Sequence, residues 1–392
     1  MRFLIAATAV LAVAGLARAT PGQLSDSFSN FADHPAIAYE STPADDAVAR
    51  LNRAIAAGTV QLTADGPSGY LRSVLDALNV PVQSQIAVFN PDSVQRAIIN
   101  PRNPRTLFFN DRVAVGWVRG GFIELAAQDP KQGVVFYVLE APGGQPRFAR
   151  RDDCLSCHYS YSTAGVPGML ARSIGQFTVD HALPFEKRWD GWYVTGDTHS
   201  VPNLGTPFPE HYDSTGYLST QSDVIALMVF DHQMHMTNLL SRIGWEARVA
   251  AAPAERQFEA PVSLAVAARE IVDYLLFVDE APLPGAVAGS SGFAEQFATA
   301  GPRDSQGRSL RQFDLHTRLM RYPCSYMIYS DVFDALPSTA KEAIYLRMWR
   351  VLSGADMDAK YSRLALRDRQ AVVEILRETK ADLPSLFGAI TR

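Results

Sequence analysis

The sequence predicts a mixed α+β protein, in which a small antiparallel β-meander and an irregular loop region precede a mainly helical C-terminal half. Three observations support this prediction. Short β-branched or aromatic runs fill residues 84–140, proline- and glycine-rich sequence fills residues 150–221, and apolar residues at helical spacing recur from residue 222 onward. With 392 residues, 47% of them hydrophobic, the chain can bury a sizeable core, which excludes collagen-like, coiled-coil and wholly disordered classes.

Residues 1–19 are predicted to be a secretory signal peptide. Arg2 supplies a positive start, residues 3–16 are almost entirely apolar, and residues 17–19 form an A-x-A cleavage site. The apolar stretch is shorter than the roughly 20 residues that span a bilayer, and no later stretch qualifies. We therefore expect export to the bacterial periplasm or medium, with no transmembrane segment after cleavage.

Two helices and a β-meander are expected within residues 20–149. Apolar residues at helical spacing fall within residues 44–57, and a second short stretch covers residues 70–78. Further runs qualify as strands, at residues 86–89, 106–109, 113–118, 122–126 and 134–139. The turn residues between them come at short intervals, so consecutive strands should pair antiparallel. Residues 142–144 (Pro-Gly-Gly) are interpreted as the exit from the sheet.

The rest of the chain is expected to divide into a haem-attachment loop region over residues 150–221 and a mainly helical region over residues 222–392. The loop region is rich in proline, glycine, serine and threonine, but its embedded aromatic residues argue against disorder and indicate that it wraps around something. Helices are expected at residues 222–248, 263–277, 340–352 and 368–378.

The assignment to haem comes from Cys154-Leu155-Ser156-Cys157-His158, which matches C-x-x-C-H, the pattern of covalent c-type haem attachment. On one helical turn, two thiols three residues apart can each add to a haem vinyl group, and the next residue can direct its imidazole at the iron. Thioether attachment takes place in the bacterial periplasm, where the expected signal peptide would deliver the chain. We predict one haem c, bound through Cys154 and Cys157, with His158 as the proximal iron ligand.

Other interpretations of the cysteine pair stay open. A thioredoxin-like redox pair normally opens a helix after a strand in a βαβ unit, whereas this pair follows an Arg-Arg-Asp-Asp loop. A structural zinc site would need two further ligands, and the sequence has no second C-x-x-C. A disulfide within the pair would leave His158 without a role. The third cysteine, Cys324, lies among apolar and aromatic residues and is expected to be a buried, inert thiol.

The far face of a haem iron either takes a sixth ligand or stays open for chemistry. Candidates for that ligand are Met169, His199, His232 and Met236. A methionine would raise the reduction potential and indicate electron transfer, whereas an open position would indicate catalysis. Arg150, Arg151 and Arg172 are the basic residues nearest the motif and are candidates for pairing with haem propionates.

Several stretches resemble a family of exported bacterial cytochrome c-like proteins that carry a single C-x-x-C-H motif. These stretches lie at residues 86–89, 103–111, 115–118, 134–139, 165–173, 188–196 and 322–326. The resemblance covers roughly residues 80–355 and implies a covalent haem without fixing a reaction. Positions that match the family pattern include His181, His199, His232, Met236 and Asn238. Asp190 departs from it, because the family often has Gly there.

The expected function is electron transfer by an exported c-type cytochrome-like protein, with a redox partner protein. The alternative is a peroxidase- or oxygenase-like haem enzyme that acts on a small molecule, with His232 or His199 as an acid–base group. Electron transfer is favoured because the sequence has no convincing catalytic constellation. Nucleic acid is not an expected partner, since the formal net charge is −5 and no basic block occurs.

Overall fold

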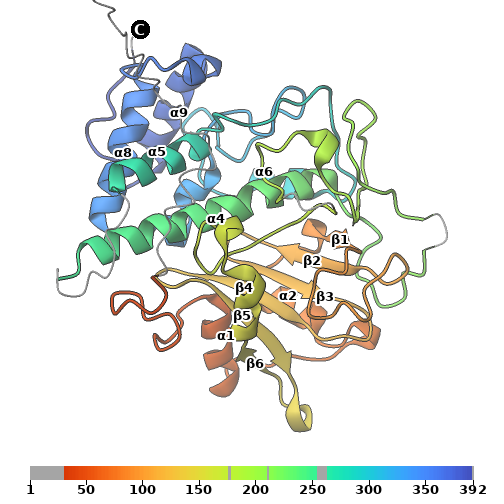
Figure 1. Cartoon of the computed structure of the whole chain (residues 1–392). Coiled ribbons are helices and arrows are strands. Elements are labelled where there is room, and N and C mark those ends of the chain that lie inside the picture. The colour runs from red at the N-terminus through yellow and green to blue at the C-terminus, as the bar shows by residue number, and fades with distance from the viewer. Residues whose placement is uncertain (1–30, 175–177, 210–211, 254–262, 391–392) are drawn as a thin grey trace, which may run out of the picture.

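The computed structural model describes residues 31–174, 178–209, 212–253 and 263–390. Its centre is a seven-stranded antiparallel sheet with the order β6-β5-β4-β3-β2-β1-β7, flanked by helices on both faces (Figure 1). The strands are β1 (Ile86–Val88), β2 (Arg105–Phe109), β3 (Val113–Trp117), β4 (Glu124–Asp129), β5 (Gly133–Glu140), β6 (Arg147–Arg150) and β7 (Trp192–Tyr193). The predicted α+β class is confirmed, as is the antiparallel meander.

The helices gather mostly in the C-terminal half. They are α1 (Ala47–Ala56), α2 (Leu71–Ala77), α3 (Leu155–His158), α4 (Val224–Ala250), α5 (Leu264–Leu275), α6 (Phe293–Thr299), α7 (Asp331–Asp334), α8 (Ser338–Leu352) and α9 (Leu366–Thr379). The six helices expected from hydrophobic spacing are all present, within a few residues at each end. Hydrophobic spacing did not predict α6 and α7, which span at most two turns and offer too few residues for a period to emerge.

One prediction about the sheet is wrong. Residues 142–144 do not end it but form the turn between β5 and β6, and Leu139 pairs with Phe148 across that turn. Gly143 and Gly144 both have positive φ, 62° and 82°, which glycine adopts without steric cost. The two glycines therefore reverse the chain tightly and return it to the same sheet.

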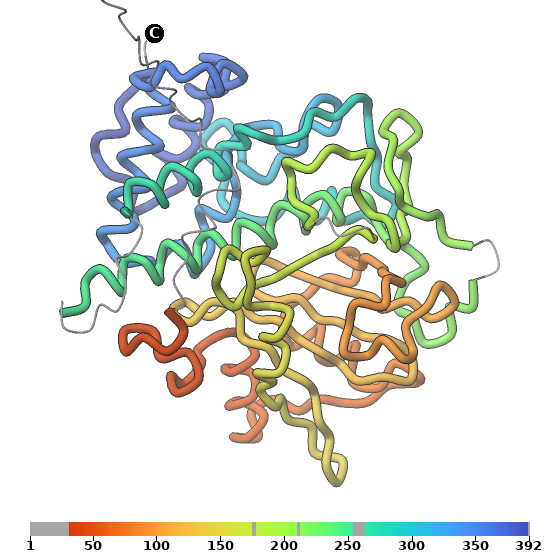
Figure 2. Tube along the Cα trace, viewed as in Figure 1, coloured from red at the N-terminus to blue at the C-terminus, as the bar shows by residue number. Residues whose placement is uncertain are grey.

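The two faces of the sheet are covered by different helices, as Figures 1 and 2 show. On one face, α1 and α2 pack on a core that includes Phe108, Val115 and Leu125. On the other, α4 packs on a core that includes Phe109 and Phe136. Helices α5 and α8 pack together on the far side of α4, away from the sheet. Successive side chains along a strand point to opposite faces of the sheet and so enter two separate cores.

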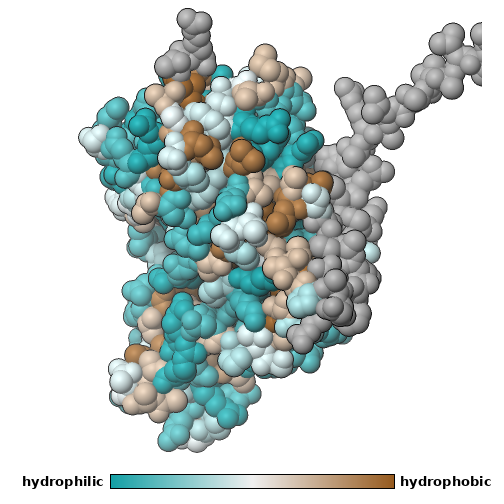
Figure 3. All heavy atoms as spheres, turned by 90° about the vertical axis from the view of Figure 1, so that its left-hand side faces the viewer, coloured by the Kyte–Doolittle hydropathy of each residue, from teal (hydrophilic) through white to brown (hydrophobic). Residues whose placement is uncertain are grey.

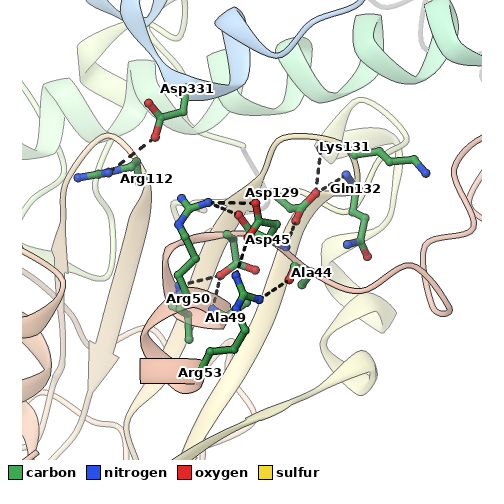
Figure 4. A network of polar contacts seen from close by, with 12 residues as sticks. Ala44, Asp45, Ala49, Arg50, Arg53, Arg112, Asp129, Lys131, Gln132 and Asp331 are labelled. Carbon is green, nitrogen blue, oxygen red and sulfur yellow. Dashed lines mark hydrogen bonds and ion pairs between the residues drawn. The ribbon is translucent and has the colours of Figure 1, made fainter. Parts of the chain in front are cut away.

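A polar network joins the start of α1 to the turn between β4 and β5 (Figure 4). The Asp129 carboxylate accepts hydrogen bonds from the backbone N–H of Asp45 at 2.7 Å and of Gln132 at 2.9 Å. Asp45 in turn forms ion pairs with Arg50 and Arg53 of α1. A buried carboxylate therefore fixes where the N-terminal helix meets the sheet.

Helix α4 begins at Asp223, whose buried side chain fixes the helix against its surroundings. One carboxylate oxygen accepts from the backbone N–H of Ile225 and Ala226, which caps the helix. The other accepts from the backbone N–H of Ser290 at 2.6 Å and of Ser291 at 2.9 Å. Helix α4 consequently has a defined position across the sheet, and its polar residues are set in place with it.

Within the described ranges, no helix is both long and apolar enough to cross a membrane. Hydrophobic residues on the face shown in Figure 3 are scattered among hydrophilic ones. The predicted signal peptide, residues 1–19, lies outside the described residues.

Candidate functional site

The C-x-x-C-H residues lie on one short helical turn just after β6. A 3₁₀ turn ends at Cys154, and α3 carries Cys157 and His158. Both cysteines are free thiols; Cys154 is half-buried and Cys157 is exposed. Residues three apart on a helical turn face the same side, so both thiols can reach one flat ligand from that side. Burial raises the pKa of the Cys154 thiol to about 11.

The His158 ring has a defined orientation and protonation state. Its Nδ1 lies 3.0 Å from the carbonyl oxygen of Gly168, and its ring lies 4.8 Å from the Phe136 ring of β5. A carbonyl can only accept a hydrogen bond, so Nδ1 must carry the proton. Burial lowers the pKa of His158, which keeps the ring neutral at pH 7. Nε2 therefore carries a lone pair that can bind a metal ion.

Asn238 of α4 holds the Gly168 carbonyl in place. Its side chain accepts from the Met169 backbone N–H at 2.9 Å and donates to the Met169 carbonyl at 2.8 Å. A Cβ at Gly168 would lie 2.3 Å from the Asn238 side-chain oxygen, so this position accommodates only glycine. Sequence reasoning named Asn238 only as a position matching the family pattern and Gly168 only within the resembling stretch at residues 165–173. It assigned neither residue a role, because both act through contacts between distant segments.

Two of the sixth-ligand candidates, Met169 and His199, differ in their surroundings. Met169 is buried and directly follows Gly168, the residue behind the His158 ring. The His199 side chain is 93% exposed and pairs with Asp197 at 2.7 Å.

The other two candidates belong to the buried interior of α4. His232 uses both ring nitrogens, Nδ1 towards Nδ1 of His181 at 2.8 Å and Nε2 towards the Ser325 hydroxyl at 2.7 Å. Met236 lies one turn further along α4 and is fully buried. Among the contacts of the described residues, none joins either side chain to His158. The identity of the sixth ligand stays a prediction.

His181 and His232 form the centre of a buried aromatic stack. The His181 ring lies 3.7 Å from the Tyr274 ring, and the His232 ring lies 4.4 Å from the Phe277 ring. His181 Nε2 is buried and has no hydrogen-bond partner among the described residues. Burial lowers the pKa of His181 well below 6.5 and lowers that of His232 to about 3. Both rings are therefore neutral at pH 7 and pack in the core as uncharged groups.

We expect the cost of replacing His232 by glutamine to depend on pH. Below pH 6.5 the His232 side chain takes up a proton in the unfolded chain. In the folded chain, whose His232 pKa is about 3, the same side chain stays neutral until the pH falls that far. The wild type therefore loses up to about 1.4 kcal/mol of stability per pH unit from this group, and His232→Gln does not. Urea unfolding of both proteins between pH 7 and pH 4 measures the difference. The exposed His199→Gln is the control, and a pH-independent difference for His232→Gln contradicts the assignment.

The three arginines that are candidates for pairing with haem propionates differ in whether a carboxylate of the chain already pairs with them. Arg150 pairs with Asp152 at 2.8 Å, and Arg151 pairs with Asp153 at 2.6 Å. The half-buried Arg172 forms no ion pair among the described residues. A further arginine, Arg105 of β2, was missed, because it is 53 positions from His158 in sequence and comes near it only in the folded sheet.

Cys324 is fully buried, as expected, and burial raises the pKa of its thiol to about 12. A thiol in that state is a poor nucleophile.

A zinc site at the motif would need further ligands. In the part of the chain that the structure describes, no three His, Cys, Asp or Glu side chains are grouped to hold a metal ion.

Comparison with protein-family models, curated proteins and solved structures finds no match for this chain.

Proposed function

We propose that the chain is a c-type cytochrome-like protein that carries one haem, bound through Cys154 and Cys157, and that transfers electrons. The observation that supports this most is the hydrogen bond between His158 Nδ1 and the Gly168 carbonyl. It leaves Nε2 as the free metal-binding atom and orients the ring, as second-shell partners of metal-bound histidines do. We also propose membership of the exported cytochrome c-like family, on the motifs that resemble it.

The residues present fit a covalently attached haem. Cys157 is exposed and Cys154 half-buried on the same turn, so both thiols are accessible for thioether formation. His158 follows directly and is neutral, as a metal-binding imidazole must be. When bound, haem iron supplies one-electron oxidation and reduction.

The chain's own residues would hold that group near the surface. The His158 imidazole is kept in one tautomer by Gly168, and Gly168 is kept in place by Asn238. Cys157 is exposed, so the edge of a ring attached there would lie near solvent. A redox partner could then exchange electrons with the iron without entering the core.

A haem enzyme is the second candidate, and one observation favours it. His232 has both ring nitrogens engaged and His199 projects into solvent. If neither these side chains nor those of Met169 and Met236 reach the iron, the far position is open to a small molecule. Such a site can bind carbon monoxide and react with peroxide.

Absorption spectra of the purified, reduced protein with and without carbon monoxide test the choice between the two functions. We expect electron transfer to give a six-coordinate spectrum that carbon monoxide leaves unchanged. A spectrum that shifts on carbon monoxide addition, together with turnover of peroxide, contradicts electron transfer and supports the enzyme. Substitution of Met169, His199, His232 or Met236 then identifies any sixth ligand by loss of the six-coordinate spectrum.

A further inference from the structure

We propose that Arg105 and Arg172 form a carboxylate-binding site for the haem propionates, at the side of the group opposite the two cysteines. The inference rests on the proposed function, because it presumes that haem is attached at Cys154 and Cys157. It assigns a role to one arginine that the sequence pattern did not single out, and it separates Arg172 from its neighbours Arg150 and Arg151.

Arg105 retains unused hydrogen-bond donors. Its Nη1 donates to Glu124 at 2.8 Å and to the Ser93 hydroxyl at 3.3 Å. Its Nε is buried and has no partner among the described residues. A guanidinium has five N–H donors in a fixed fork that matches a carboxylate, and an unpaired buried donor is costly. A propionate that paired with Arg105 would satisfy the donors that Glu124 and Ser93 leave free.

Arg172 lies outside the sheet, but its backbone is held beside the row of cross-strand partners that contains Arg105. Across the strands, Val88 of β1 pairs with Arg105 on one side and with Trp192 of β7 on the other. The Trp192 ring N–H donates to the Arg172 carbonyl at 2.9 Å, which fastens Arg172 beside this row. Cross-strand partners share a face of the sheet, so both arginines border the same face.

The same face of the sheet connects the arginines to His158 through cross-strand partners. Leu107, Gly116 and Glu124 are successive cross-strand partners, and Ala126 pairs with Phe136, the residue on which the His158 ring packs. From β5 to β2 is three strand spacings, or about 14 Å. Leu107 and Ala126 on this path are only partly buried. A flat apolar ring held at His158 could cover this strip and present its carboxylates to the arginines.

The charges near the motif are distributed in agreement with this orientation. Arg105 and Arg172 both lower the pKa of His158, and Glu124, the partner of Arg105, opposes them by raising it. Arg151, by contrast, acts on the Cys154 thiol and is already paired with Asp153. Arg151 and Arg105 are thus each paired with one carboxylate, but Arg105 keeps a buried Nε–H without a partner and Arg172 has no ion-pair partner among the described residues.

The first test measures the reduction potential of the haem-loaded protein and of Arg105→Gln and Arg172→Gln, with Arg151→Gln as the matched control. Loss of a propionate partner should lower the potential, because the freed negative charge stabilises the oxidised iron. We expect about a tenfold fall in the reduced-to-oxidised ratio at a fixed potential, or about 59 mV for one electron. Arg151→Gln should change it much less. Equal shifts in all three variants, or none, overturn the inference.

The second test uses a Cys154→Ala/Cys157→Ala background, in which haem can bind only non-covalently. Free-acid haem should bind more tightly than haem dimethyl ester, whose esterified propionates cannot pair with arginine. Adding Arg105→Gln and Arg172→Gln should remove that preference. If the ester binds as well as the free acid, the arginine site is wrong although haem binding stands. If the wild type acquires no haem at all, the proposed function itself fails.

Discussion

Replacing Cys154 and Cys157 together by alanine should abolish covalent haem. Each thiol is expected to form one thioether, so the double variant should have the bare polypeptide mass and should lose its haem to acidified organic solvent. Each single variant should keep a haem held by one bond. Coexpression with a bacterial haem-attachment system, followed by intact mass measurement and a pyridine haemochrome spectrum, gives the result.

Cys324→Ala is the matched control for this experiment. Cys324 is fully buried in the helical half, and burial raises the pKa of its thiol to about 12, so it should take no part in attachment. We expect Cys324→Ala to carry the same haem as the wild type. Haem retained by the double alanine variant after acid extraction would show that these two cysteines are not the attachment sites.

Replacing Asn238 by alanine should both destabilise the fold and weaken ligation by His158. The change leaves the buried N–H and carbonyl of Met169 without partners, which costs about 3 kcal/mol. The Gly168 carbonyl then loses its support, and the His158 ring loses its fixed orientation. We expect a lower urea midpoint and, in the loaded protein, a partial change to a spectrum without axial histidine.

Asn203→Ala separates these two effects. Asn203 bridges the Val201 carbonyl and the Gly205 N–H in a partly buried loop, so it makes a similar pair of bonds away from the motif. We expect a loss of about 1 kcal/mol with an unchanged spectrum. If Asn238→Ala loses stability but keeps the wild-type spectrum, Asn238 is only a structural residue.

Local pattern was enough to predict most of the fold. Alternating or apolar runs predict β1–β5, and apolar residues at helical spacing predict α4, α5, α8 and α9, because these elements bury much of their apolar surface. Strand β6 was missed because glycine permits both an exit and a tight reversal. Strand β7 was missed because two residues, Trp192 and Tyr193, show no period.

The candidate site likewise has residues that the local sequence pattern reveals and residues that act only through contacts between distant segments. Cys154, Cys157 and His158 are adjacent in sequence, so their spacing alone suggests what they bind. Gly168 and Asn238 support His158 through contacts across 10 and 69 sequence positions. Such contacts depend on how α4 crosses the sheet, which no spacing rule reveals. For the same reason, sequence could not tell that His232 would use both ring nitrogens within the core.

The central claim is that haem is bound covalently at Cys154 and Cys157. Intact mass spectrometry of the wild type, produced with haem-attachment machinery, tests it most directly. We expect one species, heavier than the polypeptide by one haem, with the added mass on the peptide that contains residues 154–158. A product at the bare polypeptide mass, from cells that load a known c-type cytochrome in parallel, would contradict it.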